Sequence, residues 1–517
     1  MRTNQVSTIA AAALLVLCIG GGSQAAEPFV IEAVDAETGR GVPLVELSTT
    51  NNLKFVTDSA GLAAITEPDL LGQTVHFQLR SHGYEFPADG FGIRGRRLKV
   101  RPGETAKLEM KRLNVAERLY RTTGTGIYRD TVLAGRTPPI AEPLLNAQIT
   151  GQDSMQPVLY REKLYWFWGD TGQLRYPLGN FRMAGAVSRL PGAGGLDPSV
   201  GVNYEYFKGK DGFSRAMVDL EPREGVVWVD GVFTVPDSKG RERMLGHFSR
   251  RRGLETELEH GLVLYNDTTE TFERFKTLEK SDRWRFPHGH PLKAREGDTE
   301  YFYFGIAEKN VRVKADWESV LDPAAYEAWT PLRDYSIPQR NKSHLARDAE
   351  GRVHWRWSHD APPLTEEHIK HFWEEDQAED FATRDCETGK PVRLHGGSIR
   401  WNEYRKKYVL IAVEIGGTSF LGEVWYGEAE QPTGPWERVR KIVTHERYSF
   451  YNPVHHPVFD QEGGRLIYFE GTYTREFSGN QEPTPRYDYN QVMYRLDLAD
   501  PRLAAVREPQ PTEPQRP

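Results

Sequence analysis

The sequence predicts an all-β protein in which a five-bladed β-propeller follows a small β-sandwich. Two observations lead to this prediction. A phrase made of a polar or proline-bearing approach, an aromatic strand and a turn recurs five times between Met155 and Phe477, and short strands alternate with turn residues before it. A strand-rich unit that recurs every roughly 40 to 60 residues is typical of propeller blades.

The first residues, 1–25, have the pattern of a signal peptide. An early Arg2 precedes an apolar run from Ile9 to Ile19, and small residues then end at Ala25. The run is too short to span a bilayer, and the bulky residues before Cys18 disfavour a lipid anchor. We therefore expect an exported protein, periplasmic or extracellular, with no membrane contact once the leader is removed.

Residues 27–112 are expected to form the sandwich, as short antiparallel strands such as FVIEAVD, VELSTT, TVHFQLR and AKLEMKRL between turns. Its turn motif comprises Asp35, Thr38, Gly39, Val42, Pro43 and Val45, followed by Thr57, Asp58, Gly61 and Ala63. This motif resembles that of carboxypeptidase-regulatory-like domains of the prealbumin type. The resemblance implies a sandwich fold and the role of a spacer or adhesive module.

Residues 113–143 are expected to connect the two domains. Gly124 and Gly126 lack the third glycine of a phosphate-binding loop, so this connector is expected to supply a closing strand at the edge of the propeller. The propeller is predicted over 144–497. It includes a partly helical insertion, 309–392, because ADWESVLDPAAYEAW and LTEEHIKHFWEEDQ carry helical spacing. The proline-rich tail, 498–517, is expected to be disordered.

Composition narrows the classes of partner. Lys and Arg number 66 against 73 Asp and Glu, the net charge is -7, and no basic block occurs. Nothing therefore indicates nucleic acid or an anionic membrane surface, and a polysaccharide or oligosaccharide fits better. Without the leader only Cys386 remains, so no intramolecular disulfide is expected. The oligomeric state is left open.

The sharpest candidate site is a pair of aspartates in the first repeat, Asp153 in GQDSMQP and Asp170 in WFWGDTG, beside Trp166 and Trp168. Two carboxylates near indole rings suit glycoside hydrolysis. One carboxyl protonates the leaving oxygen while the other activates water or attacks the anomeric carbon, and aromatic faces stack on sugar rings. The alternative is that both aspartates cap turns, as aspartate often does.

The run from Gln152 to Thr171, with D-x-x-x-Q-P and W-x-F-W-G-D-T, resembles the start of a bacterial family of five-bladed propellers that includes endo-acting arabinan hydrolases. The phrases Asp322-Pro323-x-x-Tyr326 and Asn452-Pro453-x-x-His456 extend the resemblance over about two thirds of the chain. In that family, paired aspartates of the first blade are the expected catalytic groups. The resemblance therefore implies a catalytic role for Asp153 and Asp170.

Further polar residues lie where strands approach the expected propeller axis. The additional catalytic candidates are Asp230, Glu414 and Glu470, and the substrate-binding candidates, besides the two tryptophans, are His288, His290, His395 and His456. Each histidine could instead bond a neighbouring carbonyl. A divalent cation in the central channel is a weaker possibility, because no pair has the i, i+4 spacing of helical metal ligands. No cofactor is otherwise expected.

The function predicted from these residues is a secreted glycoside hydrolase that degrades a polysaccharide by carboxylate acid/base catalysis in the central pocket. One alternative is a polysaccharide lyase, in which His or Tyr is the base and an arginine such as Arg182, Arg215 or Arg400 binds a uronate. The other is a non-catalytic carbohydrate-binding surface protein. The sugar, its linkage and the stereochemical course are not encoded in any recognisable motif.

Overall fold

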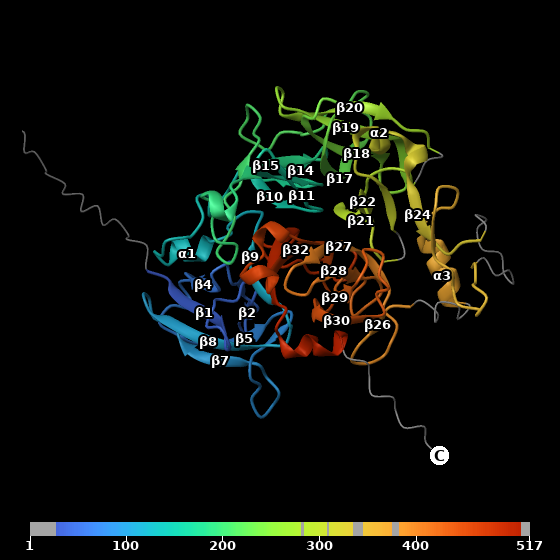
Figure 1. The fold of residues 1–517 in the computed structure, drawn as a ribbon. Helices are drawn as coiled ribbons and strands as arrows, with labels where there is room; N and C mark the ends of the chain where they lie inside the picture. Colours follow the sequence, from blue (N-terminus) through green and yellow to red (C-terminus); the bar gives the residue numbers. More distant parts are fainter. Residues whose placement is uncertain (1–26, 281–283, 308–309, 334–344, 375–381, 508–517) are drawn as a thin grey trace, which may run out of the picture.

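The computed structural model describes residues 27–280, 284–307, 310–333, 345–374 and 382–507. The expected signal peptide lies outside these residues. The fold is all-β, with a β-sandwich followed by five sheets arranged as the blades of a propeller (Figure 1). No helix of the described part is long and apolar enough to cross a membrane.

The sandwich consists of two four-stranded sheets that share one apolar core. One sheet has the order β4 (Leu62–Ile65), β1 (Phe29–Asp35), β8 (Thr105–Arg112), β6 (Tyr84–Glu85), and the other β3 (Lys54–Val56), β2 (Glu46–Ser48), β5 (Thr74–Arg80), β7 (Gly95–Lys99). Alternate side chains of β1, such as Phe29 and Ile31, meet Phe77 and Leu79 of β5 in the core. The expected antiparallel arrangement is corrected at one place, because β1 and β8 pair in parallel.

The connector closes the propeller. Its strand β9 (Glu117–Arg121) pairs with the last propeller strand, β33 (Asn490–Asp497), as the sequence predicts for a closing strand. The short helix α1 (Arg129–Leu133) follows. A small sheet then leads into the first blade, with the order β10 (Ile149–Gln152), β13 (Thr171–Gln173), β14 (Tyr176–Asn180). The chain segment that comes just before the first blade thus supplies the outermost strand of the last blade, and this links the two.

The successive strands of each blade pair antiparallel from the innermost strand outwards, and in the fourth blade one further short strand, Arg384–Asp385, joins the outer edge in parallel. The first two blades are β11 (Gln156–Tyr160), β12 (Lys163–Trp168), β15 (Ala184–Ser188), β16 (Glu205–Tyr206), and β17 (Val226–Pro236), β18 (Glu242–Arg252), β19 (Thr256–Asn266), β20 (Thr271–Thr277). The 3-10 helix η1 (Pro191–Ala193) follows β15. The innermost strands β11 and β17 lie against each other.

The third blade takes strands from the predicted insertion. It consists of β21 (Leu292–Glu296), β22 (Thr299–Phe304), β23 (Val311–Lys314), β24 (Glu327–Thr330) and β25 (Arg356–Ser358). The prediction of an insertion starting at residue 309 is therefore corrected, because four blade strands lie within it: the last three strands of this blade and Arg384–Asp385 of the next. Its helical elements are α2 (Trp317–Leu321), η3 (Pro323–Ala325) and α3 (Glu366–Glu374). The side chain of Asp316 caps α2 by accepting from the Ser319 N–H, which explains where α2 begins.

The last two blades complete the propeller. They are β27 (Leu394–Asn402), β28 (Lys407–Glu414), β29 (Val424–Ala429), β30 (Arg438–Val443), β26 (Arg384–Asp385), and β31 (Ser449–His455), β32 (Leu466–Thr474), β33, β9. The 3-10 helices η5 (Pro457–Phe459), η6 (Glu462–Gly464) and η7 (Pro501–Val506) follow β31 and β33. The expectation of a disordered tail from residue 498 is wrong for η7, because Leu503 and Val506 are buried against the last two blades.

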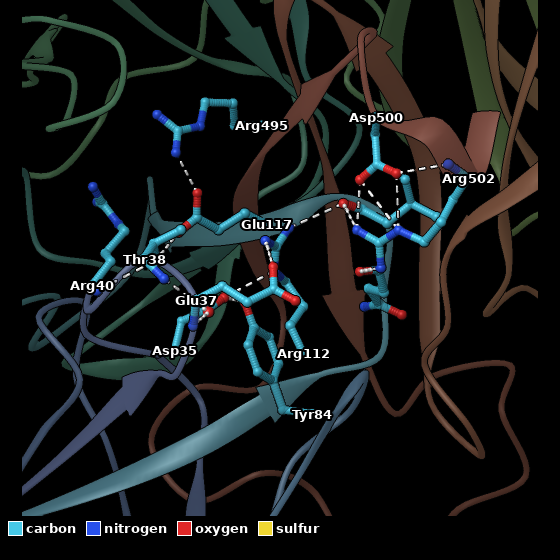
Figure 2. Close-up of polar contacts among 12 residues, drawn as sticks. Asp35, Glu37, Thr38, Arg40, Tyr84, Arg112, Glu117, Arg495, Asp500 and Arg502 are labelled. Carbon is cyan, nitrogen blue, oxygen red and sulfur yellow. Dashed lines mark hydrogen bonds and ion pairs between the residues drawn. The ribbon is translucent and has the colours of Figure 1, made fainter. Parts of the chain in front are cut away.

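A polar junction joins the sandwich to the propeller (Figure 2). Thr38 of the sandwich donates to Glu117 of β9 at 2.8 Å, and Arg495 of β33 lies 2.5 Å from the other Glu117 oxygen. Glu117 is buried, so two partners offset the cost of removing its charge from water. Beside it, Arg112 pairs with the buried Asp35 at 2.9 Å.

The junction also has an apolar part. Leu44 and Val56 of the sandwich belong to the same core cluster as side chains of the last two blades. The His82 ring lies among Tyr448 and Tyr473, with ring centroids 5.4 and 5.9 Å away. Burial lowers the pKa of His82 to about 3, so this imidazole is neutral at neutral pH. The sandwich is therefore packed onto the propeller.

Candidate functional site

Asp153 lies just before the innermost strand of blade one and contacts blade five. One carboxylate oxygen accepts from the Asp170 N–H at 2.8 Å, and the other accepts from the Tyr451 hydroxyl at 2.9 Å. Tyr489 provides a further side-chain hydrogen bond. Burial, together with the charge of Asp170, raises the pKa of Asp153 to about 7. Asp153 can therefore both give and take a proton near neutral pH.

Asp170 lies next to Asp153 and links blade one to blade two. Its Oδ1 accepts from the indole Nε1–H of Trp228 at 2.8 Å. Burial raises the pKa of Asp170, and the bond from Trp228 opposes that effect. Trp228 and Asp230 are two residues apart on β17, so both side chains leave the same face of that strand. The two predicted aspartates of blade one thus lie next to the strand that carries Asp230.

Asp230 is the third carboxylate of this region. We call the region formed by Asp153, Asp170, Trp228 and Asp230 the axial site. Its side chain is 45% exposed, while one oxygen lies 3.1 Å from the Nδ1 of His247 on β18. The other oxygen accepts from the Gly289 N–H at 3.2 Å. Burial acts to raise the pKa of Asp230, but the hydrogen bond and charge of His247 outweigh it and lower the pKa. Asp230 is therefore ionised at neutral pH.

The loop before β21 packs tightly against Asp230. Gly231 has a φ of 60°, and a Cβ on it would lie 2.5 Å from the backbone N of His288. Only glycine combines that backbone conformation with that close approach. Burial lowers the pKa of His288, whose Nδ1 lies 3.1 Å from the Phe286 carbonyl oxygen. The predicted candidate His288 is thus held against the axial site.

His290 follows two residues later and approaches blade four. Its carbonyl oxygen accepts from the Arg400 guanidinium at 3.1 Å. Burial and the charge of Arg400 lower the pKa of His290 to about 3, and burial lowers that of Arg400 to about 10. The buried Nδ1 of His290 has no partner among the described residues. His290 is therefore a neutral imidazole with an unused ring nitrogen.

The other two arginines predicted as possible uronate ligands have acidic partners. Arg182 pairs with Asp219, and Arg215 pairs with Glu270.

Trp166 and Trp168 do not face a pocket, which corrects their predicted role as sugar platforms. Both side chains are fully buried in the core between blade one and blade five. Their rings pack edge-on against Tyr204 at 5.3 and 5.1 Å. They lie on alternate positions of β12, and that face of the strand points into the core. Their role is to anchor β12, the strand that Asp170 follows by two residues.

Glu470 and His456 form a buried structural pair, which corrects their predicted roles as catalytic acid and substrate ligand. The His456 Nε2 lies 3.1 Å from Glu470 Oε1, and Thr122 donates to Glu470 Oε2 at 2.7 Å. Both members are at most 2% exposed. Because Thr122 belongs to the connector, this pair fastens the closing segment to blade five.

Glu414 and His395 have partners away from the axial site. Glu414 accepts from the Trp425 indole at 2.9 Å within its own blade, and burial raises the pKa of its carboxyl. His395 lies 3.3 Å from Glu366 at the start of α3. No hydrogen bond or ion pair recorded for the described residues joins either one to Asp153 or Asp230. Their predicted roles thus lack geometric support.

Sequence reasoning missed four residues that hold the carboxylates: Tyr451, Tyr489, Trp228 and His247. Trp228 and Tyr451 lie within the recurring phrases, next to predicted candidates, and that adjacency was the available signal. Tyr489 and His247 do not lie near the beginning of any copy of the recurring phrase. Their proximity to Asp153 and Asp230 arises only when strands of one blade or of two blades pair.

No group of three or more His, Cys, Asp or Glu side chains suited to a metal ion occurs among the described residues. A cavity of about 770 Å³ lies between blades three and four, outside the axial site. Its lining includes Trp329, Trp355, Arg384, Cys386, Trp436 and Arg438. None of the axial carboxylates lines it, so the cavity is a separate feature of the surface.

No protein-family model matches the sequence, and no curated protein sequence is similar to it. Solved structures with a similar arrangement include the exo-beta-1,3-galactanase from Phanerochaete chrysosporium with galactose, at 10% identity and a TM-score of 0.37, over 74% of this chain and 65% of that one. A variant of the alpha-L-arabinofuranosidase from Fusarium graminearum in complex with an iminosugar inhibitor matches at 11% identity and a TM-score of 0.34, over 68% and 93%. The exo-1,5-alpha-L-arabinanase from a bovine ruminal metagenomic library matches at 9% identity and 0.34, over 68% and 94%.

Proposed function

We propose that this protein is an exported glycoside hydrolase that cleaves a polysaccharide or oligosaccharide at the axial site. The observation that carries the proposal is the contrast between Asp153 and Asp230. Their surroundings raise the pKa of the first to about 7 and lower the pKa of the second. When one carboxyl group is protonated and a second is ionised at the same pH, the first can act as a general acid and the second as a base or nucleophile.

In this proposal Asp153 is the proton donor to the leaving oxygen. Tyr451 and the Asp170 backbone hold its carboxyl group in place. Burial, together with the Asp170 charge, raises its pKa to about 7, so that it is partly protonated near neutral pH. Asp230 is the ionised carboxylate that activates water or stabilises positive charge at the anomeric carbon. Asp170 tunes Asp153 and is not itself the donor. The sandwich, with its carboxypeptidase-regulatory-like turn motif, serves as a spacer or adhesive module.

The test is turnover on a panel of polysaccharides, with chromatography of the products. The panel includes β-1,3-galactan and α-1,5-arabinan, the sugars named for the enzymes of similar arrangement. Wild type should release fragments, and Asp153→Asn and Asp230→Asn should each reduce the rate about 10²- to 10⁴-fold. Glu414→Gln is the matched control, because Glu414 is also a partly buried carboxyl with a raised pKa but lies away from the site. Full activity in Asp153→Asn, or equal losses in the control, would refute the assignment.

A polysaccharide lyase is the second candidate, favoured by Arg400 and His290. A guanidinium beside a neutral imidazole could neutralise a uronate and remove the adjacent proton. A lyase releases unsaturated products that absorb in the ultraviolet, whereas a hydrolase does not. If wild type releases products that absorb in the ultraviolet and Arg400→Gln does not, the protein is a lyase and the hydrolase proposal is wrong. Sugar binding without turnover would instead indicate a non-catalytic protein.

A further inference from the structure

A chain of three hydrogen bonds runs from Asp230 into the interior of blade two. Asp230 Oδ1 lies 3.1 Å from His247 Nδ1, and His247 Nε2 lies 3.1 Å from His260 Nδ1. His260 Nε2 then lies 3.0 Å from the Glu279 carbonyl oxygen. Both imidazoles are at least 95% buried, at 4% and 1% exposure. The two imidazoles are thus enclosed between two residues that reach solvent, because the Asp230 side chain is 45% exposed and Glu279 is an exposed residue.

The number of protons in this chain follows from its two ends. A carbonyl oxygen can only accept, and a carboxylate can only accept unless it is protonated. Each of the three contacts needs one proton, so the chain needs three. Two neutral imidazoles supply two. An ionised Asp230 and two neutral rings together hold only two protons. The third proton is therefore one more than this state holds, whichever group of the chain carries it.

We infer that the Asp230–His247–His260 chain holds one excess proton at neutral pH, and that His247 and His260 are positioning residues that keep Asp230 ionised and fixed. This inference rests on the proposed function for its catalytic consequence, but the proton count does not depend on it. With the proton on the imidazoles, the carboxylate is paired with a buried cation. The chain as a whole is then neutral, which is the condition under which buried charge is tolerated.

The surroundings of the chain agree with this arrangement. The Phe286 ring stacks on His247 with centroids 3.9 Å apart and an angle of 15°. A ring face over an imidazolium is a favourable cation–π contact. The other titratable groups that face Asp230 are His288 and His290, and burial lowers the pKa of both. Neither therefore supplies a competing positive charge at neutral pH.

The direct test is nuclear magnetic resonance of the imidazole nitrogens in the ¹⁵N-labelled full chain. In wild type at pH 7.5, the signals assigned to His247 and His260 should contain one more proton than two neutral rings. In Asp230→Asn the amide donates to His247 Nδ1, so two neutral rings satisfy all three bonds. The excess proton should therefore disappear in that variant. Two neutral rings in wild type, or an imidazolium that persists in Asp230→Asn, would overturn the inference.

Kinetics tests the positioning role separately. Replacing His247 by Gln removes the positive charge, so the acid limb of the kcat/KM profile that reports Asp230 should move up by about one to three pH units. His76→Gln in the sandwich is the matched control and should leave the limb in place. An unmoved limb in a folded, active His247→Gln would refute the role. If wild type proves inactive on every sugar, the proposed function fails while the proton count stands or falls by the nitrogen spectra.

Discussion

Replacing Asp153 by Asn should make the protein more stable while it inactivates the site. The side chain is nearly isosteric with a protonated aspartate and can keep the bond from the Asp170 N–H. In wild type, the folded-state pKa of about 7 lies above the ordinary value of 3.8. The folded protein therefore binds more protons than the unfolded chain between these two pH values.

The sign and size follow from this difference. The stability that the protonated Asp153 contributes is fully present below pH 3.8 and is lost as the pH rises towards about 7. Each pH unit in that window corresponds to about 1.4 kcal/mol, so the loss approaches about 4 kcal/mol above pH 7. Asp153→Asn carries no ionisable group and escapes the loss. Its advantage over wild type should be small at pH 4 and should approach that value at pH 8.

The assay is denaturant unfolding of wild type and Asp153→Asn at several pH values between 4 and 8. Only the difference between the two proteins is used, because it cancels the contributions of titrating groups that do not interact with Asp153. Asp298→Asn is the control, since Asp298 is an exposed turn residue. A difference that does not vary with pH, or a variant less stable than wild type at pH 8, would refute the account of Asp153.

Three further predictions follow from other contacts. Gly231→Ala should lower the free energy of unfolding by about 1–3 kcal/mol and displace the loop at His288. Both effects should be measured together, as a lower Tm and a lower turnover rate. Trp166→Ala should destabilise by about 3–5 kcal/mol, and the folded fraction should keep the KM of wild type, because the ring touches core and not sugar. Acid should destabilise the protein through His82. Its folded pKa of about 3 lies below the ordinary 6.5, so stability falls by up to about 1.4 kcal/mol per pH unit as the pH drops from 6.5. His82→Gln should flatten that dependence in Tm measurements at pH 7 and 5, and an unchanged slope would contradict it.

The recurring phrase predicted the architecture because blade strands are local in sequence. Each copy spans one or two hairpins, so periodicity and turn residues were enough to indicate five units. The third blade was misjudged because its outer strands are separated by helical segments, and composition there resembles an insertion. The tail was misjudged because proline content hid Leu503 and Val506, whose burial depends on an apolar surface supplied by other blades.

The site was predictable only in part. Asp153, Asp170 and Asp230 stand out in the sequence because each lies at an end or a bulge of a strand near the start of a blade. Whether a carboxylate is a proton donor, an ionised partner or a structural anchor depends on what surrounds it. Glu470 and Asp230 both occur in aromatic strands, yet one is sealed between His456 and Thr122 while the other is 45% exposed.

The sequence by itself determined the all-β class, the repeat and the aspartates, because hydrophobic alternation and turn chemistry act over a few neighbouring residues. Only the tertiary structure decided which side chains share a site, because Tyr451 reaches Asp153 across 298 positions of sequence and Gly289 reaches Asp230 across 59. Protonation states were decided there too. They depend on burial and on charges a few ångströms away, and both are set by the packing of one blade against the next.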